Sequence, residues 1–354
     1  MQLFHLPVQH DLFHARGRFL IRTVDPEGRW PESGTDRFAR FRPMNEAAEI
    51  QYRLGLLERA KPTTLLLGNS RTLHGFSIES FDSQTFNAAM EGAQMQQQEH
   101  YAHFALDKFK VRRLIIGADF GMFIGRSEVN DEIDFGCLAF ASGCDYLSAY
   151  SSSAFKNSLV TLYNAHYGVN VASVQISANG FAPAWPSSSE QVLQVRSNKA
   201  FNIMRHAFAD GGDYPKMRKR IQAESKLQYQ ALQRVLTHAC NRNVRVQLVI
   251  LPQHREATNK IIQSGLKPEF DTYKKTITAW SGNAPCKQIE VWDFEIDSPY
   301  VRESMGDGKT DWHWFVEPFH FRPAFGAIIA DVLSGRRSEK GIARRRDANA
   351  GNDR

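Results

Sequence analysis

Three short apolar runs, separated by segments long enough for helices, limit what this chain can fold into. The runs lie at residues 64–67, 111–117 and 244–251. Strands this apolar are buried on both faces, and intervening helices are typical of parallel strands joined by crossovers. The sequence therefore predicts a three-layer α/β/α domain with a parallel central sheet.

The other patterns divide the chain into a lead-in, one large domain and a tail. We expect further strands at 85–88 and 288–294 and helices at 45–60, 95–109, 147–163, 214–241 and 324–334. Residues 1–60 form the lead-in with its helix, and residues 61–335 form the α/β domain. Within that domain, residues 121–213 are rich in Ser, Asn, Gly and Ala, so we interpret them as an insertion too polar to build its own core.

Composition excludes several classes of protein. With 42% hydrophobic and 23% charged residues among 354, the chain is not broadly disordered. No window reaches the roughly 18 apolar residues of a membrane span, and no secretory signal is visible, so as written the chain is expected to be soluble and cytoplasmic. The formal net charge is +6, but residues 336–354 hold seven Lys or Arg against three Asp or Glu. We expect a disordered basic tail there, and no nucleic-acid partner, because no aromatic side chain is interleaved with its arginines.

The four cysteines, Cys137, Cys144, Cys240 and Cys286, form no Cys-x-x-Cys pair and lack histidines at zinc-finger spacing. The sequence therefore predicts neither a metal site nor a cofactor. Cys137 and Cys144 could pair in an oxidising compartment, whereas sparse cysteines are more often small buried thiols. Both alternatives stay open.

Ser70 is the first candidate for catalysis. It follows the apolar run at 64–67 through Gly68, and the residues after it could open a helix. This places a hydroxyl at the carboxyl end of a parallel strand, where open α/β sheets bind ligands. The simpler alternative is that Ser70 only caps the helix.

His320 and Glu317 are the second candidate. A serine hydroxyl needs a base to become a nucleophile, histidine is the usual base near neutral pH, and a carboxylate holds the required tautomer. Glu317 lies three residues before His320, so a turn would bring both side chains together. Taken alone, this pair would more often be an incidental surface loop.

Four sequence blocks together resemble those of the SGNH/GDSL hydrolase superfamily. They read Gly-Asn-Ser-Arg at 68–71, Phe-Asn-Ala-Ala-Met-Glu-Gly-Ala at 86–93, Gly-Ala-Asp-Phe at 117–120 and Glu-Pro-Phe-His at 317–320. The ending His-Phe-Arg-Pro-x-x-Gly looks most like bacterial envelope members, similar to alginate O-acetylation proteins and the teichoic acid D-alanyl transfer protein. The resemblance covers about 62–120 and 240–335, under half of the chain.

The resemblance implies a flavodoxin-like fold and a Ser-His-acid triad acting on an ester or acyl group. Ser70 would be the nucleophile, His320 the base and Glu317 the orienting acid. The N–H groups of Ser70 and Gly92 would form the oxyanion hole, and Asn87 would bind substrate or support the site.

Three positions depart from the pattern of the family. Asn69 replaces the usual Asp before the nucleophile. Glu317 stands where most members have Asp, so Asp307 and Asp311 stay rival acids. Asp119 occupies a block in which many members use Asn to donate to the oxyanion, which an ionised carboxylate cannot do. We expect Asp119 to pair instead with Arg71 beside the nucleophile.

Three more side chains near these blocks are candidates for contact with substrate. His254 follows the run at 244–251 and should lie on the same rim as Ser70, where it could bind substrate or be a solvated loop residue. Trp312 and Trp314 could stack on sugar rings, although packing into the protein is the more common outcome for tryptophan.

The function predicted from these residues is acyl-ester chemistry, by an esterase or O-acyltransferase acting on a carbohydrate or cell-envelope polysaccharide. The alternative is a catalytically inactive member of the fold that binds glycan or a partner protein. The similar envelope proteins are exported or tethered by an N-terminal hydrophobic segment, so a periplasmic site and membrane association are expected only if such a segment precedes this start.

Overall fold

The described part of the chain falls into two compact units in a computed structural model. The structure describes residues 18–20, 24, 46–124, 152–169, 176–182, 214–280, 282, 286–304 and 312–347. One unit contains helix α2 (Glu46–Ala60) and helix α8 (Ser152–Tyr167). The other unit begins at Lys61, resumes at Asn179, and contains the sheet. The sequence predicted no such grouping of α2 with part of the insertion.

A six-stranded sheet in the order β2-β1-β3-β4-β5-β8 forms the centre of the second unit. The strands are β1 (Thr64–Leu67), β2 (Thr85–Asn87), β3 (Arg113–Ala118), β4 (Arg245–Ile250), β5 (Ile289–Asp293) and β8 (Arg344–Asp347). The first five are parallel, and β8 is antiparallel to β5. The registers pair Leu66 with Asn87 and with Ile115. All five parallel strands therefore end at the same edge of the sheet.

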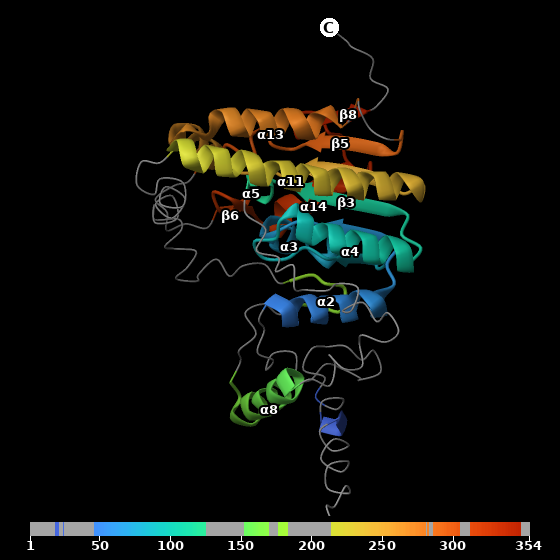
Figure 1. The fold of residues 1–354 in the computed structure, drawn as a ribbon. Coiled ribbons are helices and arrows are strands. Elements are labelled where there is room, and N and C mark those ends of the chain that lie inside the picture. The colour runs from blue at the N-terminus through green and yellow to red at the C-terminus, as the bar shows by residue number, and fades with distance from the viewer. Residues whose placement is uncertain are drawn as a thin grey trace, which may run out of the picture. The chain divides into compact units, whose positions relative to one another are not determined.

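Helices cover both faces of this sheet, as Figure 1 shows. On one face pack α4 (Met95–Lys108), α5 (Phe120–Ile124), α11 (Tyr214–Asn241) and α13 (Lys267–Ala279). On the other lie α3 (Ser70–Gly75), the 3₁₀ turn η2 (Ile78–Ser80) and α14 (Pro323–Leu333). The predicted α/β class with a mostly parallel sheet is confirmed. Among the described helices, none is long and apolar enough to cross a membrane.

Successive side chains along a strand point to opposite faces of the sheet, and here both sets are apolar, so both faces need helices. Leu66, Ile115 and Val249 point to one face, where they pack with Phe325 and Ile329 of α14. Their neighbours along the strands are equally buried and point to the opposite face. Runs that are apolar on both sides can be buried only in a sheet with helices on each face.

Two segments differ from the sequence-based expectations. Between β4 and β5 the chain forms α12 (Arg255–Ile261), a short π-helical stretch η3 (Ile262–Leu266) and then α13, none of which was predicted. After Glu317 the expected turn is closed by a small hairpin of β6 (Phe315–Glu317) and β7 (His320–Phe321). This hairpin carries the candidate acid and base.

The prediction of a disordered basic tail at 336–354 is wrong for the residues that form β8. Strand β8 pairs along the whole of Glu290–Asp293. The Arg345 guanidinium lies 5.1 Å from the centre of the Trp292 ring, a cation–π contact that helps to hold this cationic segment against the sheet. Residues 348–354 lie outside the described part of the chain.

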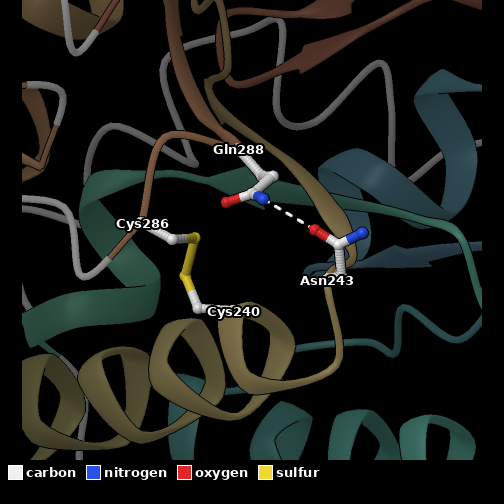
Figure 2. Close-up of a disulfide and its surroundings, with 4 residues drawn as sticks. All are labelled: Cys240, Asn243, Cys286 and Gln288. Atoms are coloured by element: carbon white, nitrogen blue, oxygen red, sulfur yellow. Dashed lines mark hydrogen bonds between the residues drawn. A yellow bond between two sulfur atoms is a disulfide. The ribbon is translucent and has the colours of Figure 1, made fainter.

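A disulfide joins Cys240, near the end of α11, to Cys286, ahead of β5 (Figure 2). Beside it, the Gln288 side-chain amide donates to Asn243 Oδ1 at 2.7 Å. Of the alternatives for the sparse cysteines, this pair forms a disulfide and does not remain as two buried thiols. Cys137 and Cys144 lie outside the described residues.

Replacing Cys240 and Cys286 together by serine should destabilise the fold. The cross-link spans 46 residues, and in the chain-entropy account closing a loop of this size contributes about 4 kcal/mol. Urea unfolding should show the double variant unfolding at lower denaturant than the oxidised wild type. Equal midpoints for the two proteins would contradict this expectation.

Candidate active site

Ser70 and His320 meet at the carboxyl edge of the sheet although 250 residues separate them. Ser70 is the first residue of α3, directly after the turn that follows β1. His320 opens β7 on the small hairpin. The Ser70 Oγ atom lies 2.8 Å from His320 Nε2, which is hydrogen-bond distance.

Glu317 completes a row of three side chains. Its Oε1 atom is hydrogen-bonded to His320 Nδ1, and its Oε2 atom accepts the Phe319 N–H at 2.9 Å. The Glu317 side chain is 2% exposed and that of His320 is 17% exposed. Because an ionised carboxylate only accepts, Nδ1 carries the proton in neutral His320, and the Nε2 lone pair faces the Ser70 hydroxyl.

The environment of Glu317 keeps its carboxyl group ionised. Burial alone would raise the pKa of Glu317, but the charge and hydrogen bond of His320, the Phe319 N–H and the Arg71 guanidinium together hold this pKa below its ordinary value. The buried charge is thus balanced by donors that are already in place. An acid in this state can stabilise an imidazolium.

Two contacts hold the hairpin that carries Glu317 and His320. The Glu303 Oε2 atom accepts the N–H groups of Trp314, at 2.9 Å, and Phe315, at 3.2 Å, just before and at the start of β6. At the hairpin turn, the carbonyl of Pro318 accepts the His254 N–H at 2.8 Å. The hairpin is therefore fixed at its base and at its turn.

Glycines allow the hairpin and α14 to approach α3, the helix that begins at Ser70. A Cβ atom on Gly75, at the end of α3, would lie 2.3 Å from the Phe321 ring, and one on Gly326 of α14 would lie 1.8 Å from the Gly75 carbonyl oxygen. Any side chain at either position would force these elements apart. The close approach of α3 to the hairpin and α14 rests on this pair of glycines.

The turn that presents Ser70 has its own supports. Asn69 caps α3, because its Oδ1 atom accepts the Arg71 N–H at 3.1 Å. The Gly68 N–H donates to the side chain of Gln98 at 2.9 Å. Cβ atoms on Gly68 and Gly117 would lie 2.1 and 2.2 Å from Thr72 Oγ1, so both glycines make room for this helix.

The loop of Gly92 is fastened to the same helix. Its neighbour Glu91 is hydrogen-bonded through Oε1 to His74 Nε2 on α3, at 2.5 Å. Gly92 has a φ of +61°, and a side chain built there would enter open space. Asn87 is fully buried; its amide nitrogen donates to the Thr72 carbonyl at 3.2 Å and its Oδ1 atom accepts the Ala89 N–H at 3.1 Å, so it links α3 to the loop after β2.

The expected pairing of Arg71 with Asp119 is wrong. Arg71 Nη2 donates instead to the side-chain oxygen of Gln253 at 2.8 Å. Asp119 is 2% exposed, and its Oδ1 atom accepts the Met122 N–H at 3.1 Å in the first turn of α5. A short Asp side chain prefers this local backbone bond, and Gln253 is long enough to reach the guanidinium.

His254, Trp312 and Trp314 have structural positions. His254 is 3% exposed: its Nδ1 atom accepts the Glu256 N–H at 3.2 Å, and Nε2 donates to the Glu303 carbonyl at 2.8 Å. Both ring nitrogens are therefore engaged by the backbone. Trp312 is buried in the core, and Trp314, partly buried, packs against the same core cluster.

Sequence reasoning missed several supporting residues of the site. Gln98, Gln253 and the pair of His74 with Glu91 come from a helix face or loop without a recognisable motif. In α4 the buried residues Met95, Tyr101 and Ala102 recur at helical spacing, and Gln98 falls on the same face. That spacing could have indicated Gln98 as a polar group on a buried face. The rival acids Asp307 and Asp311 lie outside the described residues.

Comparison with known proteins leaves the site to be interpreted from its own geometry. No family model matches this sequence, and a search of curated proteins found no match either. Within the described ranges, no group of three or more His, Cys, Asp or Glu side chains is arranged to hold a metal ion.

Proposed function

We propose that this chain performs serine-dependent acyl-ester chemistry, as an esterase or an O-acyltransferase, through Ser70, His320 and Glu317. The observation that carries the proposal is the 2.8 Å contact of Ser70 Oγ with His320 Nε2, with Nδ1 of the same ring bonded to a buried carboxylate. This is the arrangement that turns a weak hydroxyl nucleophile into a strong one.

The chemistry follows from the protonation states of the three groups. His320 Nε2 takes the Ser70 proton as Oγ attacks the acyl carbon, and the imidazolium is stabilised by Glu317. The N–H groups of Ser70 and Gly92 then stabilise the oxyanion. His320 returns the proton to the departing alcohol, which leaves an acyl-serine that water or an acceptor hydroxyl resolves.

The finer assignment of the fold and of the substrate belongs to the same proposal. The strand order β2-β1-β3-β4-β5 agrees with a flavodoxin-like SGNH domain. A carbohydrate or cell-envelope polysaccharide as the substrate is suggested by the sequence resemblance. The Cys240–Cys286 disulfide supports an oxidising compartment, in which such polymers are modified.

A fluorophosphonate probe tests the proposal directly, because it labels only activated serines. The wild-type chain should be labelled, and peptide mapping should place the label on Ser70. Ser70→Ala should abolish labelling, whereas Ser77→Ala, a matched change in the loop that follows α3, should retain it. A folded wild type that stays unlabelled would favour the alternative of an inactive glycan- or protein-binding member of the fold.

A further inference from the structure

A chain of side-chain hydrogen bonds runs from the residue next to the nucleophile into the interior. Arg71 Nη2 donates to Gln253 Oε1 at 2.8 Å, and Gln253 Nε2 donates to Thr258 Oγ1 at 3.0 Å. Thr258 Oγ1 then donates to Glu295 Oε1 at 3.2 Å. The chain connects α3, the loop after β4, α12 and the loop after β5, which are four separate segments of the fold.

The two ends give this chain a single direction. A guanidinium can only donate hydrogen bonds, and an ionised carboxylate can only accept them. The Gln253 amide must therefore present its oxygen to Arg71 and its nitrogen to Thr258. The Thr258 hydroxyl must in turn point its proton at Glu295. Such a chain is held firmly only while Glu295 is an acceptor.

Glu295 lies among charged groups in a shielded position. Its side chain is 8% exposed, and Lys274 Nζ lies 3.8 Å from its Oε2 atom while bonding Asp293 Oδ1 at 2.6 Å. Burial raises the pKa of Glu295 to about 7; Asp293 adds to the rise, whereas Lys274, Arg71 and the Thr258 bond oppose it. Tyr273 faces the same group and stays neutral, because burial raises its pKa.

The Arg71 end of this hydrogen-bond chain reaches the β6–β7 hairpin, which carries Glu317 and His320. The Arg71 guanidinium lies 5.9 Å from the centre of the Phe319 ring, and Phe319 sits in the turn between Glu317 and His320. The positive charge of Arg71 also helps to lower the pKa of Glu317. Arg71 thus contacts the hairpin with its side chain and belongs to the nucleophile turn with its backbone.

We propose that Glu295 is a positioning residue that, in its ionised form, anchors Arg71 through Thr258 and Gln253 and so keeps the Ser70 turn aligned with the Glu317–His320 hairpin. The inference rests on the proposed function, because it assigns a role within that reaction. When Glu295 takes up a proton, it becomes a competing donor toward Thr258, and the chain loses its anchor. The site should therefore be better aligned above neutral pH than below it.

The test compares wild type with Glu295→Gln by the rate of fluorophosphonate labelling at Ser70 across pH. Glutamine resembles the protonated side chain but cannot ionise. The ratio of the wild-type rate to the variant rate should be near 1 at about pH 5.5 and should rise to about tenfold at about pH 8.5. Any pH dependence of labelling that the two proteins have in common cancels in this ratio.

A matched control and a second variant separate positioning from general damage. Glu290→Gln changes the same residue type near the opposite end of β5, where Glu290 accepts from Gln247, and its ratio should not vary with pH. Thr258→Val should slow labelling as Glu295→Gln does, and Thr258→Ser, which keeps the hydroxyl, should be labelled at the wild-type rate. The double variant Thr258→Val with Glu295→Gln should be labelled no more slowly than the slower single variant, because both changes break the same chain of hydrogen bonds.

The outcomes are distinguishable. A wild type that is never labelled refutes the proposed function. If the wild type is labelled and the ratio of the wild-type rate to the Glu295→Gln rate is 1 at every pH, or exceeds 1 by the same factor at every pH, the positioning role is overturned. If Glu295→Gln does not fold, the comparison of Thr258→Val with Thr258→Ser decides: equal rates for these two variants refute the anchor.

Discussion

Glu317→Gln should slow labelling of Ser70 about a thousandfold while leaving the protein folded. The carboxylate serves two donors at once, His320 Nδ1 and the Phe319 N–H, with one oxygen for each. An amide has only one oxygen. If that oxygen accepts from His320, the amide nitrogen faces another donor; if the amide flips, it forces the proton onto Nε2, the wrong tautomer for deprotonating Ser70.

The measurement is the second-order rate of fluorophosphonate labelling, with thermal unfolding as the check on folding. Glu290→Gln again provides the matched control, because its carboxylate lies on β5 and pairs with Arg245. A Glu317→Gln protein that is labelled at the wild-type rate would remove Glu317 from the triad. Asp307 and Asp311 would then be the acids to test.

Gly326→Ala should destabilise the protein by roughly 3 kcal/mol, the upper part of the usual range for overpacking, although alanine normally favours a helix over glycine. The added methyl group would lie 1.8 Å from the Gly75 carbonyl oxygen, so the backbone of α14 or α3 has to move. Labelling should fall as well, because α14 continues directly from the β7 strand that carries His320.

The free energy of unfolding in urea measures this effect. Gly282→Ala is the control, since a methyl group there would come no closer than 3.9 Å to its neighbours, and its stability should change by less than about 0.5 kcal/mol. If Gly326→Ala is as stable as wild type, then the close packing of α14 on α3 does not hold together the two segments that carry Ser70 and His320.

The sheet and the three proposed catalytic residues could be predicted because short-range patterns encode them. Apolar runs at 64–67 and 244–251 have no place except a covered parallel sheet, and both contain observed strands. The spacing of Glu317 and His320 lets one turn bring both side chains together. The contact of His320 with Ser70 depends on the topology of the sheet. The order of strands and helices along the sequence leaves few topologies possible, because parallel strands joined by helices all end at the same edge.

The helices between β4 and β5 and the partner of Arg71 could not be predicted, because they depend on contacts that no local sequence pattern specifies. Gly265 and Pro268 interrupt the segment between β4 and β5, so its helices were overlooked, although the chain continues through the glycine with a φ of +83°. The sequence does not distinguish Asp119 from Gln253 as the partner of Arg71, because both follow neighbouring strands at the same edge of the sheet. Only side-chain reach and competition from the backbone distinguish them.

The antiparallel strand β8 at the edge of the sheet has a consequence away from the proposed catalytic site. A parallel sheet that ended at β5 would leave a row of backbone donors and acceptors open to any extended peptide, including another molecule of the same kind. Arg344–Asp347 occupies that row from within the chain. Because β8 is now the outermost strand, its own outer edge takes over that exposed position, and its three consecutive arginines disfavour pairing with a like strand there.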